Sequence, residues 1–144
     1  MAFLSNLNIS ASALTAQRLR MDVIAENIAN ATTTRTADGT PYRRKYTVMQ
    51  EQQVSFSDHF AASKIKMTGG GVKVAQISED PSDFKLVYDP QHPDANEDGY
   101  VSMPNVDTAR EMVDFISASR TYEANITMLN ATKNMATKAL ELFK

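Results

Sequence analysis

The stretch after Pro104 constrains the fold more than any other part of the chain. It contains no Gly or Pro as far as Lys144, so no residue in it interrupts a helix. Thr108 followed by Glu111 matches a capping box at its start. We predict a helix of about 35 residues, roughly 50 Å long, which is too long for a compact domain in a chain of 144 residues.

The apolar residues of this helix recur every seven positions. One series contains Phe115, Tyr122, Leu129, Ala136 and Phe143, and a complementary series contains Met112, Ile126 and Leu140, with Ser119 and Lys133 as weaker members. Two such series predict a coiled-coil seam against another helix. Further apolar residues fall outside the seam: Val113, Ile116, Met128, Met135 and Leu142. The apolar surface is therefore wider than one partner helix covers.

A second helix is predicted near the N-terminus, over residues 8–31. This stretch is rich in alanine and lacks Gly and Pro. It carries its own heptad series, formed by Leu7, Leu14, Met21 and Ile28. We expect Asn8 or Ser10 to cap its start and the β-branched run 32–34 to end it.

The middle of the chain has the pattern of short strands. Residues 45–50, 72–77, 84–89 and 99–103 are β-prone, and turn clusters at 68–71 and 79–83 separate them. Residues 55–67 are compatible with an irregular stretch or a short helix. The predicted fold is α+β: terminal helices paired in coiled-coil fashion, with a small, mostly antiparallel β segment between them. Residues 1–31 and 105–144 form the helical domain, and residues 32–104 form the β-rich segment.

One loop resembles part of a calcium site. Asp94, Asn96, Asp98 and Gly99 have the spacing of the first half of an EF-hand loop. The closing position, however, holds Asn105 instead of Glu, and a predicted strand precedes the loop where an EF-hand needs a helix. A polar turn is the better interpretation, and a calcium-binding module remains the alternative.

The composition offers little to catalysis or to other binding classes. The chain has no Cys, and His59 and His92 stand apart from any cluster of ligand-type residues. The net charge of −2 provides no general attraction to nucleic acid, and no apolar run reaches membrane-spanning length. We expect no enzymatic activity, no cofactor or metal, no small-molecule substrate, no nucleic-acid partner and no direct membrane insertion.

The wide apolar surface favours association between chains. Pairing of the two helices within one chain is expected, but it would leave the outlying apolar residues exposed. The residues expected in an assembly interface are Leu7, Leu14, Met21, Asn27, Ile28 and Asn30 in the first helix, and Met112, Phe115, Tyr122, Asn125, Ile126, Leu129, Ala136, Leu140 and Phe143 in the second. The Asn side chains would fix the register, because a buried amide tolerates few pairings. A helical adaptor that forms a discrete oligomer is the second alternative.

Three segments resemble a known family. Residues 26–45, "ENIANATTTRTADGTPYRRK", are similar to the N-terminal signature of the bacterial flagellar rod and hook axial proteins. Residues 87–107 and 111–133 are similar to the proximal-rod members of that family.

The resemblance implies a structural, non-catalytic role. Terminal helices of such proteins form an inner layer around an axial channel, and the middle segment contributes to the wall of a hollow, torque-transmitting rod. The implied partners are copies of the chain, other proximal and distal rod subunits, and the basal-body adaptor to the export gate. The implied location is the rod spanning the periplasm, reached by flagellar type III export without a cleaved signal peptide.

Overall fold

The computed structural model describes residues 2–52 and 70–141. In chain order these contain helix α1 (Ala2–Ala29), strands β1 (Lys45–Glu51), β2 (Val72–Glu79), β3 (Lys85–Tyr88) and β4 (Tyr100–Met103), and helix α3 (Thr108–Glu141). Long terminal helices with antiparallel strands between them confirm the α+β class. The ambiguous stretch 55–67 lies outside the described residues.

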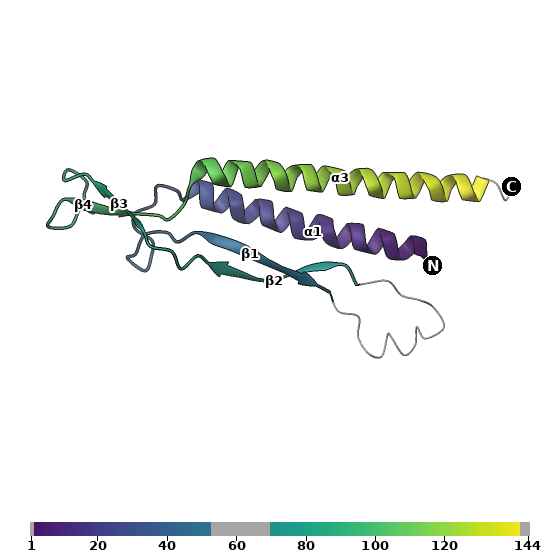
Figure 1. The fold of residues 1–144 in the computed structure, drawn as a ribbon, viewed down its shortest axis with the longest axis horizontal. Coiled ribbons are helices and arrows are strands. Elements are labelled where there is room, and N and C mark those ends of the chain that lie inside the picture. Colours follow the sequence, from purple (N-terminus) through teal and green to yellow (C-terminus); the bar gives the residue numbers. More distant parts are fainter. Residues whose placement is uncertain (1, 53–69, 142–144) are drawn as a thin grey trace.

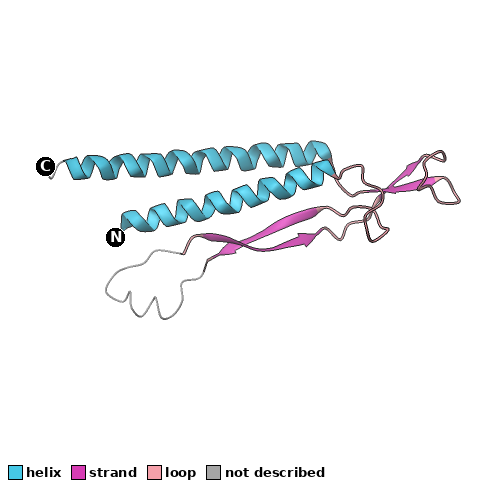
Figure 2. Ribbon diagram, turned by 180° about the vertical axis from the view of Figure 1, so that it is seen from behind, coloured by secondary structure: helices cyan, strands magenta, loops and turns pink. Residues whose placement is uncertain are grey.

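The elements form an elongated stack (Figure 1). Helices α1 and α3 lie side by side in opposite directions, and the β1–β2 hairpin runs along another side of α1. Seen from behind, the order is the same, with α1 in the middle (Figure 2). The β3–β4 hairpin extends beyond the end of the helices that is opposite both termini. Helix α1 is therefore the central element, because it contacts α3, β1 and β2.

Helix α1 begins earlier than the sequence suggested. It starts at Ala2, so Asn8 and Ser10 lie inside the helix and neither caps its start. Its regular turns stop at Ala29, where the Asn30 side chain donates back to the Glu26 carbonyl at 2.9 Å. The end of α1 was predicted to within two residues.

Helix α3 starts at Thr108 as predicted, but with a different cap. Asp107 Oδ1 accepts from the backbone N–H of Ala109 at 3.1 Å and of Arg110 at 3.4 Å, which makes Asp107 the N-cap. The predicted capping box of Thr108 and Glu111 is wrong, because the Glu111 carboxylate is turned into the protein and bonds elsewhere.

The face that α3 turns toward α1 agrees with only one of the two predicted series. Tyr122, Leu129 and Ala136 are half-buried. Phe115 of that series is exposed, as are Met112, Ile126 and Leu140 of the complementary series, so these four do not line the contact with α1 within the chain, and their place in a seam between chains stays a prediction. The buried residues stand one position earlier: Glu111, Ala118 and Thr132. Small side chains at 118 and 132 let the two helices approach closely, which a sequence search for large apolar residues misses.

The middle segment forms two separate two-stranded sheets instead of one β unit. In the first, β1 pairs antiparallel with β2 from Lys45 opposite Glu79 to Glu51 opposite Val72, with a bulge after Val48. In the second, β3 pairs with β4 from Lys85 opposite Met103 to Tyr88 opposite Tyr100.

The first hairpin touches α1 closely at the end where Glu51 pairs with Val72. The backbone N–H of Val72 donates to Ser12 Oγ at 3.1 Å, and Ser12 Oγ donates to the Ile9 carbonyl at 2.7 Å. Gly71 has a φ of 90°, and a Cβ at this position would collide with Ser12 Oγ. Glycine is required here for both reasons.

Candidate assembly surfaces

The three layers are joined at the end of α1 by one buried amide. Asn27 has no exposed surface. Its Nδ2 donates to the Lys45 carbonyl at 2.8 Å and to Glu111 Oε2 at 3.0 Å. Its Oδ1 accepts from the Tyr42 hydroxyl and from the Lys45 backbone N–H, each at 2.9 Å. All four hydrogen-bonding positions of the amide are thus used, and they connect α1, the start of β1 and the start of α3.

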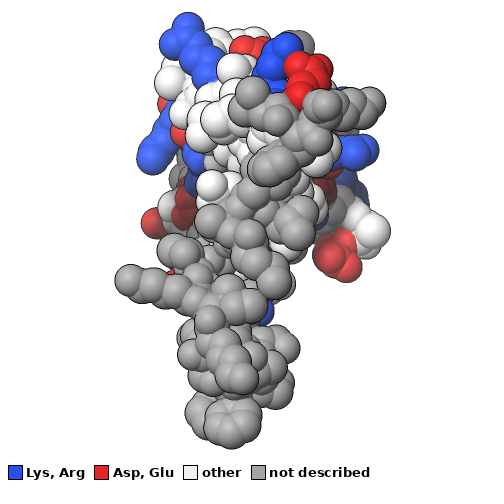
Figure 3. Space-filling view, turned by 90° about the vertical axis from the view of Figure 1, so that its right-hand side faces the viewer, with Lys and Arg blue, Asp and Glu red and all other residues white. Residues whose placement is uncertain are grey.

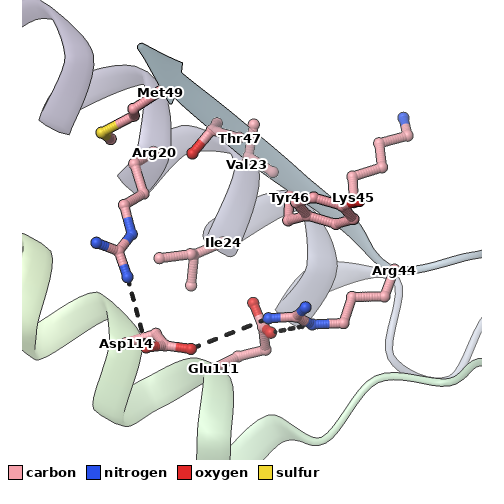
Figure 4. A pocket seen from close by; sticks show the side chains of 10 residues that line it. All are labelled: Arg20, Val23, Ile24, Arg44, Lys45, Tyr46, Thr47, Met49, Glu111 and Asp114. Carbon is pink, nitrogen blue, oxygen red and sulfur yellow. Dashed lines mark hydrogen bonds and ion pairs between the residues drawn. The ribbon is translucent and has the colours of Figure 1, made fainter. Parts of the chain in front are cut away.

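The Glu111 carboxylate is buried as well, with 1% of its surface exposed. Arg44 Nε donates to its second oxygen, Oε1, at 2.7 Å. The same guanidinium lies 3.6 Å from Asp80. It also lies 3.9 Å from Asp114, which in turn lies 3.5 Å from Arg20 of α1 (Figure 4). A buried carboxylate paired and fully hydrogen-bonded in this way is tolerated, whereas an unpaired one is costly.

The Tyr42 phenol responds to this environment. Burial raises its pKa to about 12, and the nearby carboxylates of Glu26, Glu111 and Glu79 add to the rise. Since the hydroxyl donates to Asn27, the fold needs the neutral phenol. We name this group of Asn27, Tyr42, Arg44 and Glu111 the junction cluster.

Asn105 attaches the outer part of the chain to the junction cluster. Its Oδ1 accepts from the Arg44 backbone N–H at 2.8 Å, and its Nδ2 donates to Ser82 Oγ at 2.8 Å. The guanidinium of Arg43 donates to the Asp80 and Ser82 carbonyls and stacks 4.5 Å over the Phe84 ring. The connection between the two hairpins is thereby held at the start of α3.

Large apolar side chains lie exposed on the surface of α3. Met112, Val113 and Ile116 expose 58%, 67% and 52% of their surface near its start. Met128, Met135 and Leu140 are similarly exposed toward its end. Strand β3 adds Leu86 and Tyr88 on the outer hairpin. Apolar exposure of this extent is typical of interaction surfaces.

The residues expected in an assembly interface fall into several environments. Asn27 is buried, and four residues are exposed: Met112, Phe115, Ile126 and Leu140. The other described residues are half-buried: Leu7, Leu14, Met21, Ile28, Asn30, Tyr122, Asn125, Leu129 and Ala136. Phe143 lies outside the described residues. The Asn30 and Asn125 amides each donate to a carbonyl of their own helix, so a role in register stays a prediction.

Sequence reasoning missed most of the junction cluster. Only Asn27 was chosen, and it was chosen for contacts between chains. A signal for Glu111 existed, because it stands four residues before Phe115 and seven before Ala118, in phase with the apolar seam. A charged residue in such a phase indicates a buried partner. Nothing nearby in the sequence indicates Arg44 as that partner.

The calcium-like loop folds as a polar turn. Asn96 Oδ1 accepts from the backbone N–H groups of Asp98 and Tyr100, and Gly99 adopts a φ of 79°. Asp94 accepts from the Thr34 hydroxyl at 2.8 Å and lies near Arg35. Among the described residues no three His, Cys, Asp or Glu side chains gather where they could hold a metal ion.

Known proteins resemble this chain along its whole length. The family model described as flagella basal body rod protein matches residues 7–35, and the model described as flagellar basal body rod FlgEFG protein C-terminal matches residues 97–142. A flagellar basal-body rod protein FlgC of Bacillus subtilis is 54% identical, with 96% of this chain and 97% of the relative aligned. The FlgC proteins of Borreliella burgdorferi and of an Escherichia coli strain are 45% and 46% identical, over at least 98% of either chain.

The chain belongs to the FlgC family of flagellar basal-body rod proteins. Like the other FlgC proteins, it is a structural rod subunit of the basal body.

Neither α1 nor the described part of α3 is apolar enough over a sufficient length to cross a membrane. Seen from the end that carries both termini, the described basic and acidic side chains are interspersed around the rim (Figure 3).

Replacing Asn27 with Ala should destabilise the fold strongly. The change leaves Oε2 of the buried Glu111 carboxylate, the Tyr42 hydroxyl and two backbone groups of Lys45 without the hydrogen bond that Asn27 provides, while Arg44 still binds Glu111 Oε1. We expect the free energy of unfolding in urea to fall by about 3 kcal/mol or more. Asn30→Ala is the matched control, because the two hydrogen bonds that it removes, to the Glu26 carbonyl and from the Thr33 hydroxyl, are local and lie near the surface, and it should cost about 1 kcal/mol. Equal losses in the two variants would contradict the central role of Asn27.

The raised pKa of Tyr42 makes stability depend on alkaline pH. The unfolded phenol ionises near pH 10, whereas the folded one ionises near pH 12. The contribution of Tyr42 is therefore complete below pH 10 and is lost as the pH rises toward 12, by up to about 2 to 3 kcal/mol. Unfolding titrations from pH 8 to 12 should show this loss in the wild-type chain but not in Tyr42→Phe. Parallel curves for the two proteins would refute the assignment.

Proposed function

We propose that this chain is a subunit of the proximal part of the rod and that its terminal helices carry its assembly. In this proposal residues 1–31 and 105–144 are the assembly domain, and residues 32–104 form contacts in the rod wall. Copies of the chain join each other, neighbouring proximal and distal rod subunits, and the adaptor to the export gate. The product is a hollow shaft that transmits torque and encloses the export channel.

The observation that carries the proposal is the apolar surface of α3 that α1 leaves uncovered. Val113 and Ile116 are more than half exposed although they are aliphatic. Covering them with neighbouring subunits removes apolar area from water at about 25 cal/mol per Å². A monomeric protein gains nothing from such residues, whereas a polymer subunit does.

A rod also requires a particular kind of interface. One face of each subunit must meet a different face of the next, and the operation must not close into a ring. A long pair of helices supplies different faces along α1 and α3, and coiled-coil-like packing between them suits an inner helical layer. The protruding β3–β4 hairpin, with Leu86 and Tyr88 exposed, is suited to contacts farther out.

The proposal extends to the route and the location of the subunit, and membership of the rod family supports it. The subunit leaves the cytoplasm through the flagellar type III pathway without a cleaved signal peptide and joins a rod that spans the periplasm. It performs no catalysis and takes no cofactor, and its contribution is mechanical.

An acidic side chain on the uncovered face of α3 should prevent incorporation into the rod. Ile116→Asp places a charge where a neighbouring subunit is proposed to pack, and burying an unpaired charge costs several kcal/mol. Ser117→Asp is the control, since it puts the same charge on the next, already polar, exposed residue. Quantitative mass spectrometry of isolated basal bodies should show the chain lost from rods for Ile116→Asp only. Normal amounts of the Ile116→Asp chain would exclude this face from the interface.

The free subunit should contain less helix than the assembled one. Residues 137–141 of α3 are all exposed, so the described part of the chain buries none of them to compensate the entropy lost when this end becomes ordered. Circular dichroism of dilute monomer should report fewer helical residues than the 28 of α1 and 34 of α3 together. Full helix content in the monomer would mean that the ends are ordered before assembly.

A further inference from the structure

Each terminal helix carries a second series of residues, spaced alternately by four and three positions, on its outer side. On α3 this series is Ala109, Val113, Ile116, Arg120, Glu123, Thr127, Asn130 and Asn134. On α1 it is Asn8, Ala11, Thr15, Arg18, Asp22, Ala25 and Ala29. Every member of both series is exposed. Alternating spacing of this kind lines up along one face of a helix, as in a coiled-coil seam.

The α3 series lies on the side away from α1. Arg120 stands nine residues after the buried Glu111, which at about 100° per residue is half a turn from it. The α1 series lies outside the contacts that α1 makes within the chain, because its members are exposed while Val23, Ile24 and Asn27 are buried between the layers. Near its start the α3 series carries the bulky side chains of Val113 and Ile116, whereas the α1 series ends with the small side chains of Ala25 and Ala29.

The charges at the centre of the two series are complementary. Helix α1 carries Arg18 and then Asp22, and α3 carries Arg120 and then Glu123. When the helices run in opposite directions, Arg18 can face Glu123 while Asp22 faces Arg120. Within the described residues, none of the four belongs to an ion pair of its own chain.

We propose that the outer face of α3 in one copy packs antiparallel on the outer face of α1 in the next copy, in the register set by these two ion pairs. This inference rests on the proposed function and names the contact between copies. The same register places Ile116 opposite Ala25 and Val113 opposite Ala29. Large side chains thus meet small ones, as close helix packing requires.

Neighbouring registers lose this match. Sliding the helices by one heptad brings Arg18 opposite Asn130 in one direction and opposite Ile116 in the other. Asp22 then faces Thr127 or Val113, so both ion pairs are broken. Exposed ion pairs contribute little affinity, but they distinguish registers and partners, while the apolar contacts provide the affinity.

The register also fixes how successive copies are displaced. Within one chain, Asn27 lies opposite Glu111 and Arg20 lies opposite Asp114. In the proposed contact the next α1 is shifted by about three to eight residues relative to these two pairings, or about 5 to 12 Å along the helix axis. Because a face of α3 meets a face of α1 and the copies are shifted, the contact repeats without closing.

Cysteine cross-linking tests the register directly, because the chain has no Cys of its own. In a chain carrying Ala25→Cys and Ile116→Cys, mild oxidation of isolated basal bodies should produce covalent dimers and larger multiples of the 15.9 kDa subunit. The control pairs Ile116→Cys with Ala11→Cys, which the proposed register places about 20 Å apart. Multiples from the first pair alone support the inference.

The outcomes separate this inference from the proposed function. Rods that contain the chain in normal amount but give no multiples from the Ala25 and Ile116 pair would overturn the register and leave the proposed function standing. Multiples from the control pair would overturn it as well. Absence of the unmodified chain from isolated rods would overturn the proposed function itself.

Charge reversal provides a second readout. Asp22→Arg alone and Arg120→Asp alone each place like charges together, and each should reduce incorporation by about tenfold or more. The chain with both changes restores opposite charges in every contact, and incorporation should return to within about twofold of wild type. A double variant that assembles as poorly as the single variants would overturn the proposed pairing.

Discussion

The buried hydrogen bond between the Asn27 amide and the Glu111 carboxylate fixes the geometry of the molecule. It joins residues 84 positions apart in the chain, at the point where α1 ends, β1 begins and α3 begins. Arg44 neutralises the carboxylate and Tyr42 completes the amide, so neither polar group is left unsatisfied. The angle between the helix pair and the hairpins is therefore set at one end of the stack.

Order should decrease with distance from this cluster. Close to it, polar bonds and buried aliphatic residues such as Val23 and Ile24 hold the layers together. Toward the two termini the contacts of α3 become sparse, and its last described turn extends past α1 (Figure 1). A subunit built in this way has a defined core orientation, and its sparsely packed ends are suited to the proposed export through a channel before assembly.

The local features of the fold were readable from the sequence, and the long-range ones were not. All four strands were predicted to within two residues, because β-branched runs between turn clusters are a local signal. The Thr108 and Glu111 pattern also looked local, and this misled the prediction: the carboxylate bonds Arg44, 67 residues away. The α3 residues that are buried within the chain were missed for a related reason, since Ala118 and Thr132 pack well because they are small, and hydrophobicity alone does not single them out.

A subunit of an open polymer must satisfy two opposing demands, and the exposed faces of its helices reflect both. Continuous apolar faces would bind strongly but would also aggregate before assembly, without a preferred register. On α3 the aliphatic residues Val113 and Ile116 are followed by Arg120 and Glu123, so affinity and register come from successive turns of one helix. Separating them in this way allows the subunit to discriminate against a wrong neighbour, because a slipped contact buries unpaired charge while a correct one does not.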